Sequence, residues 1–431
     1  MNYYSLNHIA PNTTFENAVI KGLAPDRGLY FPETITALDP SFFETIETLS
    51  NEEIAYEAIK QFISPEIPEA ILKTIVTETL SFEFPVVKLT DSISTLELFH
   101  GPTMAFKDVG ARFMARCLGH FNKNNSNEVT VLVATSGDTG GAVANGFLGV
   151  KGVRVVILYP SGKVSDIQEK QLTTLGQNIT ALEVEGTFDD CQDMVKKAFL
   201  DTDLTSKMQL TSANSINVAR WLPQLFYFMF AYKQLKNKYK DIVFSVPSGN
   251  FGNVCAGMIA QKLGLPIKHF IASNNDNNVV TRYLKSADYE PKPSVQTVSN
   301  AMDVGNPSNF IRIQAIYNND FETLKSNLSS YSFSDIETKE ALDEIYTTTG
   351  YIADPHGAVG YLGCKSYLMT NSEAHCVFLE TAHPTKFLDV VKDVVAVDIP
   401  LPKQIKAVID KVKVATQIND YSEFKAFLTE L

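Results

Sequence analysis

Short apolar runs alternate with helical patterns along most of this 431-residue chain. From about residue 82 onward, runs of apolar residues are separated by stretches in which apolar positions recur at steps of three and four. Such runs predict buried strands, and the stretches between them predict helices that cover both faces of parallel sheets. We therefore expect an α/β protein with two sheets. The predicted strands are 129–136, 153–160, 179–184, 241–248, 268–273 and 376–381.

The leading part of the chain has a different pattern. Helical periodicity over residues 51–80 follows a turn-rich start, and no cluster of catalytic residue types is present there. We expect a small α-rich N-terminal domain over 1–82 and a catalytic region over 83–431. The catalytic region should contain two α/β subdomains, the smaller covering roughly 115–220, and an irregular insertion around 275–335 that is rich in Asn, Ser and Pro.

Composition and charge mainly exclude classes of function. The hydrophobic content of 45% is that of a packed globular protein, and the net charge of −12 disfavours binding to nucleic acid or to an anionic membrane. The most apolar stretch is interrupted by Pro223 and is shorter than the ~20 residues that a membrane span needs, so we expect a long buried helix over 216–239. No secretory signal pattern is visible, and the five scattered cysteines are typical of buried thiols in the cytoplasm.

Residues 100–116 place a single lysine, Lys107, after small and apolar residues and at the start of a helical pattern. Packing at such a junction removes solvent from the ammonium, which favours the neutral amine and nucleophilic chemistry. The alternative is that Lys107 pairs with Asp108 at a solvated helix start. This stretch by itself leaves both interpretations open.

Three loops follow predicted strands at the edge where parallel sheets bind their ligands. TSGDTGG (135–141) would direct several backbone N–H groups at an anion. SGNFGN (248–253) has two glycines before a helix, which suits a phosphate. SANSINVAR (212–220) combines Arg220 with amide and hydroxyl donors at a helix start, which suits a substrate phosphate. For each loop, the alternative is an ordinary turn or a capped helix start.

A fourth feature is Thr381, which ends a buried strand and whose hydroxyl needs a cofactor ring nitrogen or a backbone carbonyl as its partner. A desolvated lysine, a glycine-rich phosphate loop and a strand-end hydroxyl are the parts that a pyridoxal phosphate enzyme needs. With these parts in this order, the chain strongly resembles the threonine synthases of bacterial and fungal type. The motifs that carry the resemblance are LELFHGPTMAFKDVGARFMAR, ATSGDTGGAVA, VVILYPSGKVS, SANSINVAR, SVPSGNFGN, SNAMDV, DPHGAVGY and LETAHPTKF.

The resemblance implies a tryptophan synthase β-like fold (fold type II) that holds pyridoxal 5'-phosphate between two α/β domains. It implies a carbon–oxygen lyase acting on phosphate, which converts O-phospho-L-homoserine and water to L-threonine and phosphate in the last step of threonine biosynthesis. Lys107 would form the Schiff base and act as the main acid–base group, and Thr381 would face the pyridine nitrogen. The remaining contacts implied are Ser248, Gly249, Asn250, Phe251, Gly252 and Asn253 for the cofactor phosphate, Ser136, Asp138 and Thr139 for the substrate carboxylate, and Asn214, Ser215 and Arg220 for the substrate phosphate.

Two other functions are compatible with parts of this pattern. A threonine or serine dehydratase, or a phospho-lyase that forms 2-oxobutyrate, would share the fold but would not need a second phosphate site. A non-catalytic binding protein on the same scaffold would not need Lys107. The resemblance further implies a monomer that acts on a small molecule. The acidic net charge and the lack of CxxC, HExxH or HxH spacing lead us to expect no nucleic acid, membrane or metal partner.

Overall fold

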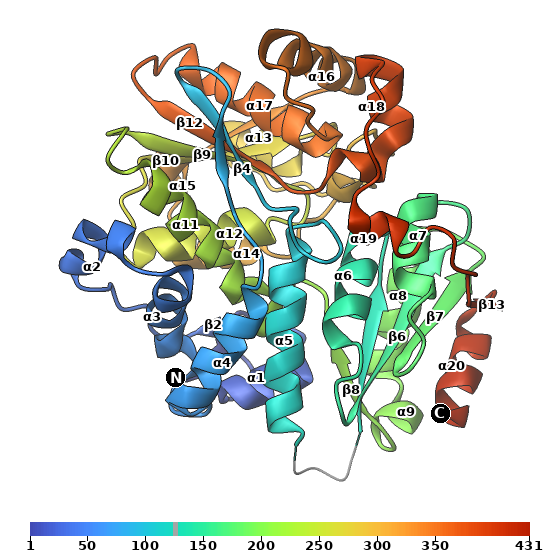
Figure 1. Cartoon of the computed structure of the whole chain (residues 1–431). Coiled ribbons are helices and arrows are strands. Elements are labelled where there is room, and N and C mark those ends of the chain that lie inside the picture. Colours follow the sequence, from blue (N-terminus) through green and yellow to red (C-terminus); the bar gives the residue numbers. More distant parts are fainter. Residues whose placement is uncertain (124–127) are drawn as a thin grey trace.

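The computed structural model describes residues 1–123 and 128–431, which form two lobes, each built around one large sheet (Figure 1). All the strands of these two sheets are parallel to their neighbours except β3, which runs antiparallel to β4. The expected α/β architecture with two parallel sheets is confirmed. The six-stranded sheet has the order β11 (Leu328–Ser332), β10 (His269–Asn274), β9 (Ile242–Pro247), β12 (His375–Glu380), β4 (Ile93–Glu97) and β3 (Val86–Lys88). The five-stranded sheet has the order β13 (Thr416–Ile418), β7 (Ile179–Val184), β6 (Val153–Pro160), β5 (Val129–Ala134) and β8 (Gln209–Ser212).

Helices cover both faces of the five-stranded sheet, because alternate side chains of its fully buried strands point to opposite sides. Leu132 and Val156 belong to a cluster with residues of α8, whereas Val131 and Val155 belong to the main core with residues of α6. The helices of this smaller lobe are α6 (Asp138–Phe147), α7 (Asp166–Thr173), α8 (Phe188–Leu200) and the C-terminal α20 (Tyr421–Glu430).

The six-stranded sheet is covered in the same way. Val243 and Phe378 share a buried cluster with residues of α16 and α17, and Phe244 and Val377 face the main core with α11 and α12. The helices of this larger lobe are α11 (Leu225–Leu235), α12 (Gly252–Lys262), α16 (Asp335–Thr349), α17 (Pro355–Leu368) and α18 (Leu388–Val395).

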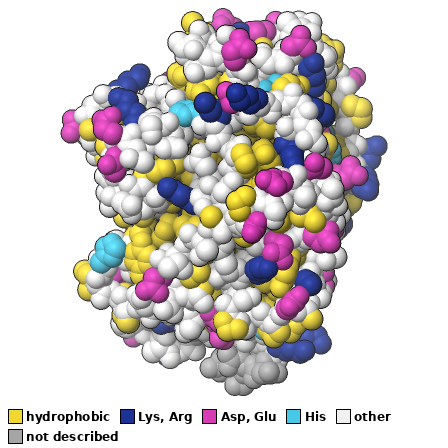
Figure 2. All heavy atoms as spheres, turned by 90° about the vertical axis from the view of Figure 1, so that its left-hand side faces the viewer, with side chains coloured by type: hydrophobic (Ala, Val, Ile, Leu, Met, Phe, Trp, Pro, Cys, Tyr) yellow, Lys and Arg dark blue, Asp and Glu magenta, His cyan; other side chains and the backbone are white. Residues whose placement is uncertain are grey.

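The N-terminal residues form a helical layer beside the larger lobe (Figure 1). It begins with a small antiparallel sheet of β1 (Tyr3–Ser5) and β2 (Tyr30–Pro32) and continues with α1 (Phe15–Lys21), α2 (Pro40–Glu44), α3 (Asn51–Ile63) and α4 (Glu69–Thr79). A capping box between Ser50 and Glu53 starts α3, as expected for a Ser three residues before Glu. On this side of the molecule, acidic and basic side chains are interspersed with hydrophobic ones (Figure 2).

Two expectations from the sequence were wrong in detail. The predicted long helix over 216–239 is divided into α10 (Val218–Trp221), a 3-10 turn at 222–224 and α11, because Pro223 has no N–H to continue the helical ladder. The stretch 275–335 is more regular than expected, although residues 287–299 and 303–309 contain no helix or strand. It contains three helices and β11, which pairs with β10, so its Asn and Ser residues reflect helix ends and buried polar contacts. The helices are α13 (Val279–Ser286), α14 (Phe310–Ile316) and α15 (Phe321–Asn327).

The C-terminal segment returns from the larger to the smaller lobe. After α18, the chain adds β13 to the five-stranded sheet beside β7, so this sheet includes residues far beyond the predicted range of roughly 115–220. All five cysteines are buried and free, as the sequence predicted. Among residues 1–123 and 128–431, no helix has both the length and the apolar character needed to cross a membrane.

Candidate active site

Lys107 is the first residue of α5 (Lys107–Phe121), the long helix that stands between the lobes (Figure 1). Its preceding loop is bound to the end of β12 through the backbone. The N–H of Phe106 donates to the carbonyl of Thr381 at 2.8 Å, and the N–H of His383 donates to the carbonyl of Met104 at 3.1 Å. Thr381 therefore lies next to the loop that carries Lys107, and its hydroxyl has no hydrogen-bond partner among the described residues.

The surroundings of Lys107 favour its neutral amine. Burial lowers the pKa of Lys107 most, the carboxylate of Asp138 raises it, and the cations Lys386 and Arg220 lower it further, so that the pKa lies below its ordinary value. The alternative ion pair with Asp108 is not formed. The Asp108 carboxylate instead accepts hydrogen bonds from the N–H and the hydroxyl of Thr103, at 2.9 Å and 2.6 Å.

The SGNFGN loop has the geometry of an anion cradle. Among the described residues, none of the backbone N–H groups of 249–254 finds an acceptor, and the loop leads into the N-terminus of α12 through Phe251 at a φ of 59°. Asn253 is 6% exposed, and neither atom of its side-chain amide has a partner in the described chain. Buried polar groups are rarely left unpaired, so these donors fit a phosphate that the chain does not itself supply.

The cradle is backed by two of the other motifs. A Cβ on Gly249 would lie 2.6 Å from Cα of Met302, so only glycine fits against the SNAMDV loop. The N–H of Ala301 donates to Nε2 of His356 at 3.1 Å, and Nδ1 of His356 lies 3.2 Å from the Asp354 carboxylate. His356 of DPHGAVGY therefore holds the backbone that packs against the cradle.

The TSGDTGG loop is a second group of free donors. The Thr135 hydroxyl accepts from the N–H groups of Gly137 and Gly140 at 3.0 Å and 2.8 Å, which shapes the turn around a Gly137 φ of 136°. Within the described chain, the N–H groups of Ser136, Asp138 and Thr139 have no acceptor. They lie at the start of α6, where the helix dipole favours an anion.

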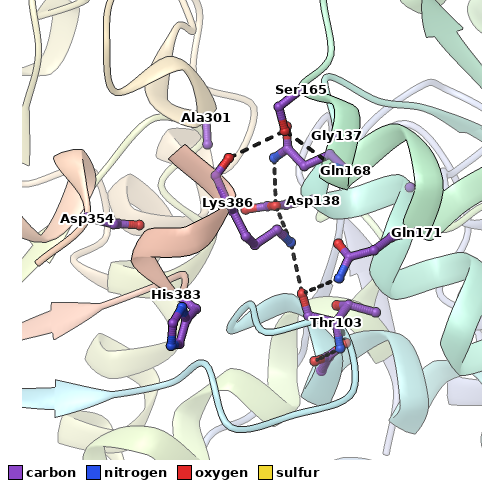
Figure 3. Close-up of polar contacts among 12 residues, drawn as sticks. Thr103, Gly137, Asp138, Ser165, Gln168, Gln171, Ala301, Asp354, His383 and Lys386 are labelled. Atoms are coloured by element: carbon purple, nitrogen blue, oxygen red, sulfur yellow. Dashed lines mark hydrogen bonds and ion pairs between the residues drawn. The ribbon is translucent and has the colours of Figure 1, made fainter. Parts of the chain in front are cut away.

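The side chain of Asp138 is already engaged. Its Oδ1 lies 2.6 Å from Nζ of Lys386 and accepts a hydrogen bond from Gln168 at 2.8 Å (Figure 3). Burial alone would raise the pKa of Asp138, but the charges of Lys386 and Lys107 and these hydrogen bonds outweigh it and hold the pKa well below its ordinary value. Asp138 can therefore offer an anion only its backbone N–H.

The SANSINVAR loop lies against the SGNFGN cradle. The hydroxyl of Ser215 accepts hydrogen bonds from Asn250 at 2.8 Å and from Asn309 at 3.1 Å, so residues 212–220 meet the SGNFGN cradle directly. Arg220 is buried, and burial lowers its pKa to about 10. One guanidinium nitrogen of Arg220 donates to the carbonyl of Ala213, but its Nε has no partner among the described residues.

Sequence reasoning missed three residues of this site: Asn309, Arg312 and Lys386. Asn309 also donates to the carbonyl of Asn250 at 3.0 Å, and Arg312 donates to the carbonyl of Ile216 at 2.6 Å. Asn309 directly precedes the short α14 and Arg312 lies within it. No sequence pattern marked either residue as part of the site. Lys386 follows a predicted buried strand within LETAHPTKF, but nothing in that position indicates that its ammonium is buried and paired.

His383, in the loop after β12, has a structural role. Its Nδ1 lies 2.9 Å from the hydroxyl of Thr385 and accepts from the Thr385 N–H at 3.2 Å. Burial lowers its pKa to about 4, so the ring is neutral near neutral pH.

Models of three protein families match consecutive parts of the chain. The model of pyridoxal-phosphate dependent enzymes matches residues 93–379. The models of the threonine synthase N terminus and of the threonine synthase C-terminal region match residues 2–80 and 357–428. The likeness to threonine synthases therefore continues beyond residue 395, where the sequence showed no further motif.

Individual relatives agree with these matches. Threonine synthase from Haemophilus influenzae is 43% identical over 99% of both chains, and threonine synthase from Saccharomyces cerevisiae is 37% identical over 91% of this chain and 88% of its own. The crystal structure of threonine synthase from Escherichia coli matches with a TM-score of 0.94 and 39% identity over 100% of both chains. The structure of pyridoxal phosphate-bound threonine synthase from Brucella melitensis matches with a TM-score of 0.93 and 33% identity over 100% of this chain and 99% of its own.

Proposed function

Because the chain belongs to the threonine synthase family of pyridoxal phosphate-dependent enzymes, we propose that it converts O-phospho-L-homoserine and water to L-threonine and phosphate, with Lys107 as the reactive amine. The observation that carries this proposal is the set of free donors on three loops around one lysine. The 249–254 cradle, the start of α6 and the buried Nε of Arg220 are each suited to an anion. One cofactor phosphate, one substrate carboxylate and one substrate phosphate together account for all three.

The cofactor contacts follow from the loops. The residues of SGNFGN would bind the cofactor phosphate through the backbone N–H groups and the side chain of Asn253. The hydroxyl of Thr381, at the end of β12, would face the pyridine nitrogen, and Lys107 would hold the cofactor covalently. When bound, pyridoxal phosphate supplies the electron-withdrawing ring that stabilises negative charge on a substrate carbon.

The substrate contacts use the other two loops. Ser136, Asp138 and Thr139 would bind the substrate carboxylate with their N–H groups at the start of α6. Asn214, Ser215 and Arg220 would bind the substrate phosphate, with Arg220 contributing the charge. With both ends of the substrate fixed, the carbons between them are presented to Lys107.

Lys107 is proposed to move the protons. Its lowered pKa increases the share of neutral amine relative to an exposed lysine, and the neutral amine can remove the proton from Cα of the substrate. Loss of a second proton, from Cβ, then supplies the electron pair that expels phosphate from Cγ. The ammonium of Lys107 can return a proton at Cγ, after which water adds its hydroxyl at Cβ and Cα regains a proton. Arg220 keeps the leaving phosphate charge-paired while the bond to it breaks.

A product assay tests this function. Purified chain supplied with pyridoxal phosphate and O-phospho-L-homoserine should release threonine and phosphate in equal amounts. Release of 2-oxobutyrate and ammonia without threonine would show a phospho-lyase or dehydratase instead. Absence of any product, together with no change in cofactor absorbance on adding the chain, would show a binding protein.

The finer statements about the chain are proposals of the same kind. We propose a monomeric, cytoplasmic enzyme with residues 1–82 as a separate N-terminal domain. The buried free cysteines support a reducing compartment, the net charge of −12 disfavours self-association, and the match of residues 2–80 to the model of the threonine synthase N terminus supports the N-terminal domain. Size-exclusion chromatography with light scattering would test the monomer.

A further inference from the structure

Lys386 is a fully enclosed lysine that contacts both lobes. It is 1% exposed, lies in the 3-10 turn Pro384–Phe387 after β12, and places its Nζ 2.6 Å from Oδ1 of Asp138 (Figure 3). Nζ also donates to the carbonyl of Thr103 at 2.9 Å. Asp138 begins α6 of the smaller lobe, and Thr103 belongs to the loop just before Lys107. One ammonium thus joins three separate segments of the site.

Helix α7 completes this arrangement from the smaller lobe. Gln168 donates to Oδ1 of Asp138 at 2.8 Å, and Gln171 donates to the same Thr103 carbonyl at 3.2 Å. A buried ammonium or carboxylate is costly unless it is paired and hydrogen-bonded. The charges of Lys386 and Asp138 are therefore compatible with burial only while the two lobes keep this relative position.

We propose that Lys386 is a positioning residue: its buried ammonium fixes the start of α6 and the loop before Lys107 relative to each other across the two lobes. The proposal rests on the function proposed above, because the two segments it joins carry the substrate carboxylate site and the reactive amine. In this role Lys386 acts through the two segments that it joins, by setting the distance between the groups that they carry.

The same contacts give the proposal an electrostatic signature at Lys107. The charged groups that face Lys107 are Asp138, which raises its pKa, and Lys386 and Arg220, which lower it. Removing the charge of Lys386 should therefore raise the pKa of Lys107, and removing the charge of Asp138 should lower it. If Lys386 only filled space, removing its charge would leave the pKa of Lys107 unchanged.

The experiment uses four variants of the full chain. Lys386→Met removes the ammonium, Lys386→Arg keeps a charge, and the double variant Asp138→Asn/Lys386→Met removes both members of the pair. Lys236→Met is the matched control, because Lys236 is also largely buried, pairs with a carboxylate at 2.6 Å and donates to a backbone carbonyl at 3.0 Å, but lies at the end of α11 and contacts only the N-terminal layer through these bonds. The readouts are kcat of the cofactor-loaded enzyme and the pH dependence of Lys107 acetylation in cofactor-free chain, followed by peptide mass spectrometry.

We expect Lys386→Met to lower kcat about 100-fold, the size seen when reacting groups are misplaced by about 1 Å, and to raise the pKa of Lys107. Lys386→Arg should recover most of kcat, and Lys236→Met should change neither readout. The double variant should return the pKa of Lys107 towards that of the unmodified chain while kcat stays low.

An unchanged kcat and an unchanged Lys107 titration in Lys386→Met would overturn the proposal. If Lys386→Met does not fold, the double variant decides, because it leaves no unpaired buried charge; normal kcat in that variant would also overturn the positioning role. Threonine formation by Lys107→Ala would refute the function proposed for Lys107 instead. The acetylation readout needs no cofactor, so it tests the role of Lys386 whether or not the function proposed for Lys107 is correct.

Discussion

Replacing Gly249 by alanine is a direct test of the cofactor phosphate cradle. The added Cβ would lie 2.6 Å from Cα of Met302 and 3.1 Å from the carbonyl oxygen of Ala301. Both neighbours are backbone atoms, so a side-chain rotation cannot relieve the contact. The Ala301 N–H is also held by His356, whose ring packs between the Asp354 carboxylate and Phe387. We expect residues 249–251, which directly precede α12, to shift instead.

The size of the effect follows from overpacking. Inserting a methyl group into a closely packed region costs about 1–3 kcal/mol. If the loop moves, its phosphate-binding conformation is destabilised by this free energy. That destabilisation corresponds to about 5- to 150-fold weaker cofactor binding. The free energy of unfolding of the cofactor-free chain should change less, because a displaced loop relieves most of the contact.

The assay is a titration of the chain with pyridoxal phosphate, followed by cofactor absorbance, and a thermal unfolding curve without cofactor. Gly119→Ala is the control, since a Cβ there would meet only Cγ1 of Val150 at 3.2 Å, on α5 and away from the cradle. Cofactor affinity in Gly249→Ala equal to that of Gly119→Ala, with both chains folded, would refute the assignment of this loop.

Four further predictions concern single residues. Lys107→Ala should lower kcat for threonine formation by about 10²–10⁴-fold and abolish the absorbance of covalently held cofactor; an active variant would remove Lys107 from the mechanism. Thr381→Val keeps the shape but loses the hydroxyl, so cofactor titration should show about 2- to 10-fold weaker binding, and unchanged binding would contradict the pyridine contact. Arg220→Lys should raise KM for O-phospho-L-homoserine about 10- to 100-fold without altering cofactor affinity, because lysine lacks the planar fork; equal loss of both would place Arg220 at the cofactor. His375 is buried and its pKa is lowered to about 4, so it stays neutral when folded but takes up a proton when unfolded. Stability should be fully present above about pH 6.5 and be lost as the pH falls towards 4, and His375→Gln should flatten this loss in thermal unfolding across that range.

The strands could be predicted because fully buried parallel strands are continuous apolar runs with clear ends. The predicted strands 153–160 and 179–184 coincide with β6 and β7 residue for residue. Helix ends were predicted less well. The apolar pattern predicts one continuous helix over 216–239, but Pro223 divides it. In 275–335, the Asn and Ser residues suggested irregular chain, although several of them make buried hydrogen bonds, such as Asn275 to Thr297 at 2.8 Å.

The residues proposed to react could be selected from the sequence, because each lies at the end of a predicted strand or the start of a predicted helix. Lys107 begins α5, and Thr381 directly follows β12. What the sequence does not contain is which loops touch. Ser215 meets Asn309, 94 positions later, because the crossovers of the six-stranded sheet bring α14 against the cradle.

Lys386 shows why the remaining part of the site could not be predicted. Taken alone, a lysine after a buried strand is expected at the surface, since burying an unpaired ammonium is strongly unfavourable. Taken alone, an aspartate in a loop meant for a carboxylate also looks misplaced, because two anions repel. Each residue becomes favourable only in the presence of the other, and they come from different lobes and from positions 138 and 386. A pattern that judges residues by their neighbours in sequence therefore does not predict this pair, whereas in the folded chain Lys386 keeps Asp138 ionised at the start of α6, beside the backbone N–H groups proposed to bind the substrate carboxylate.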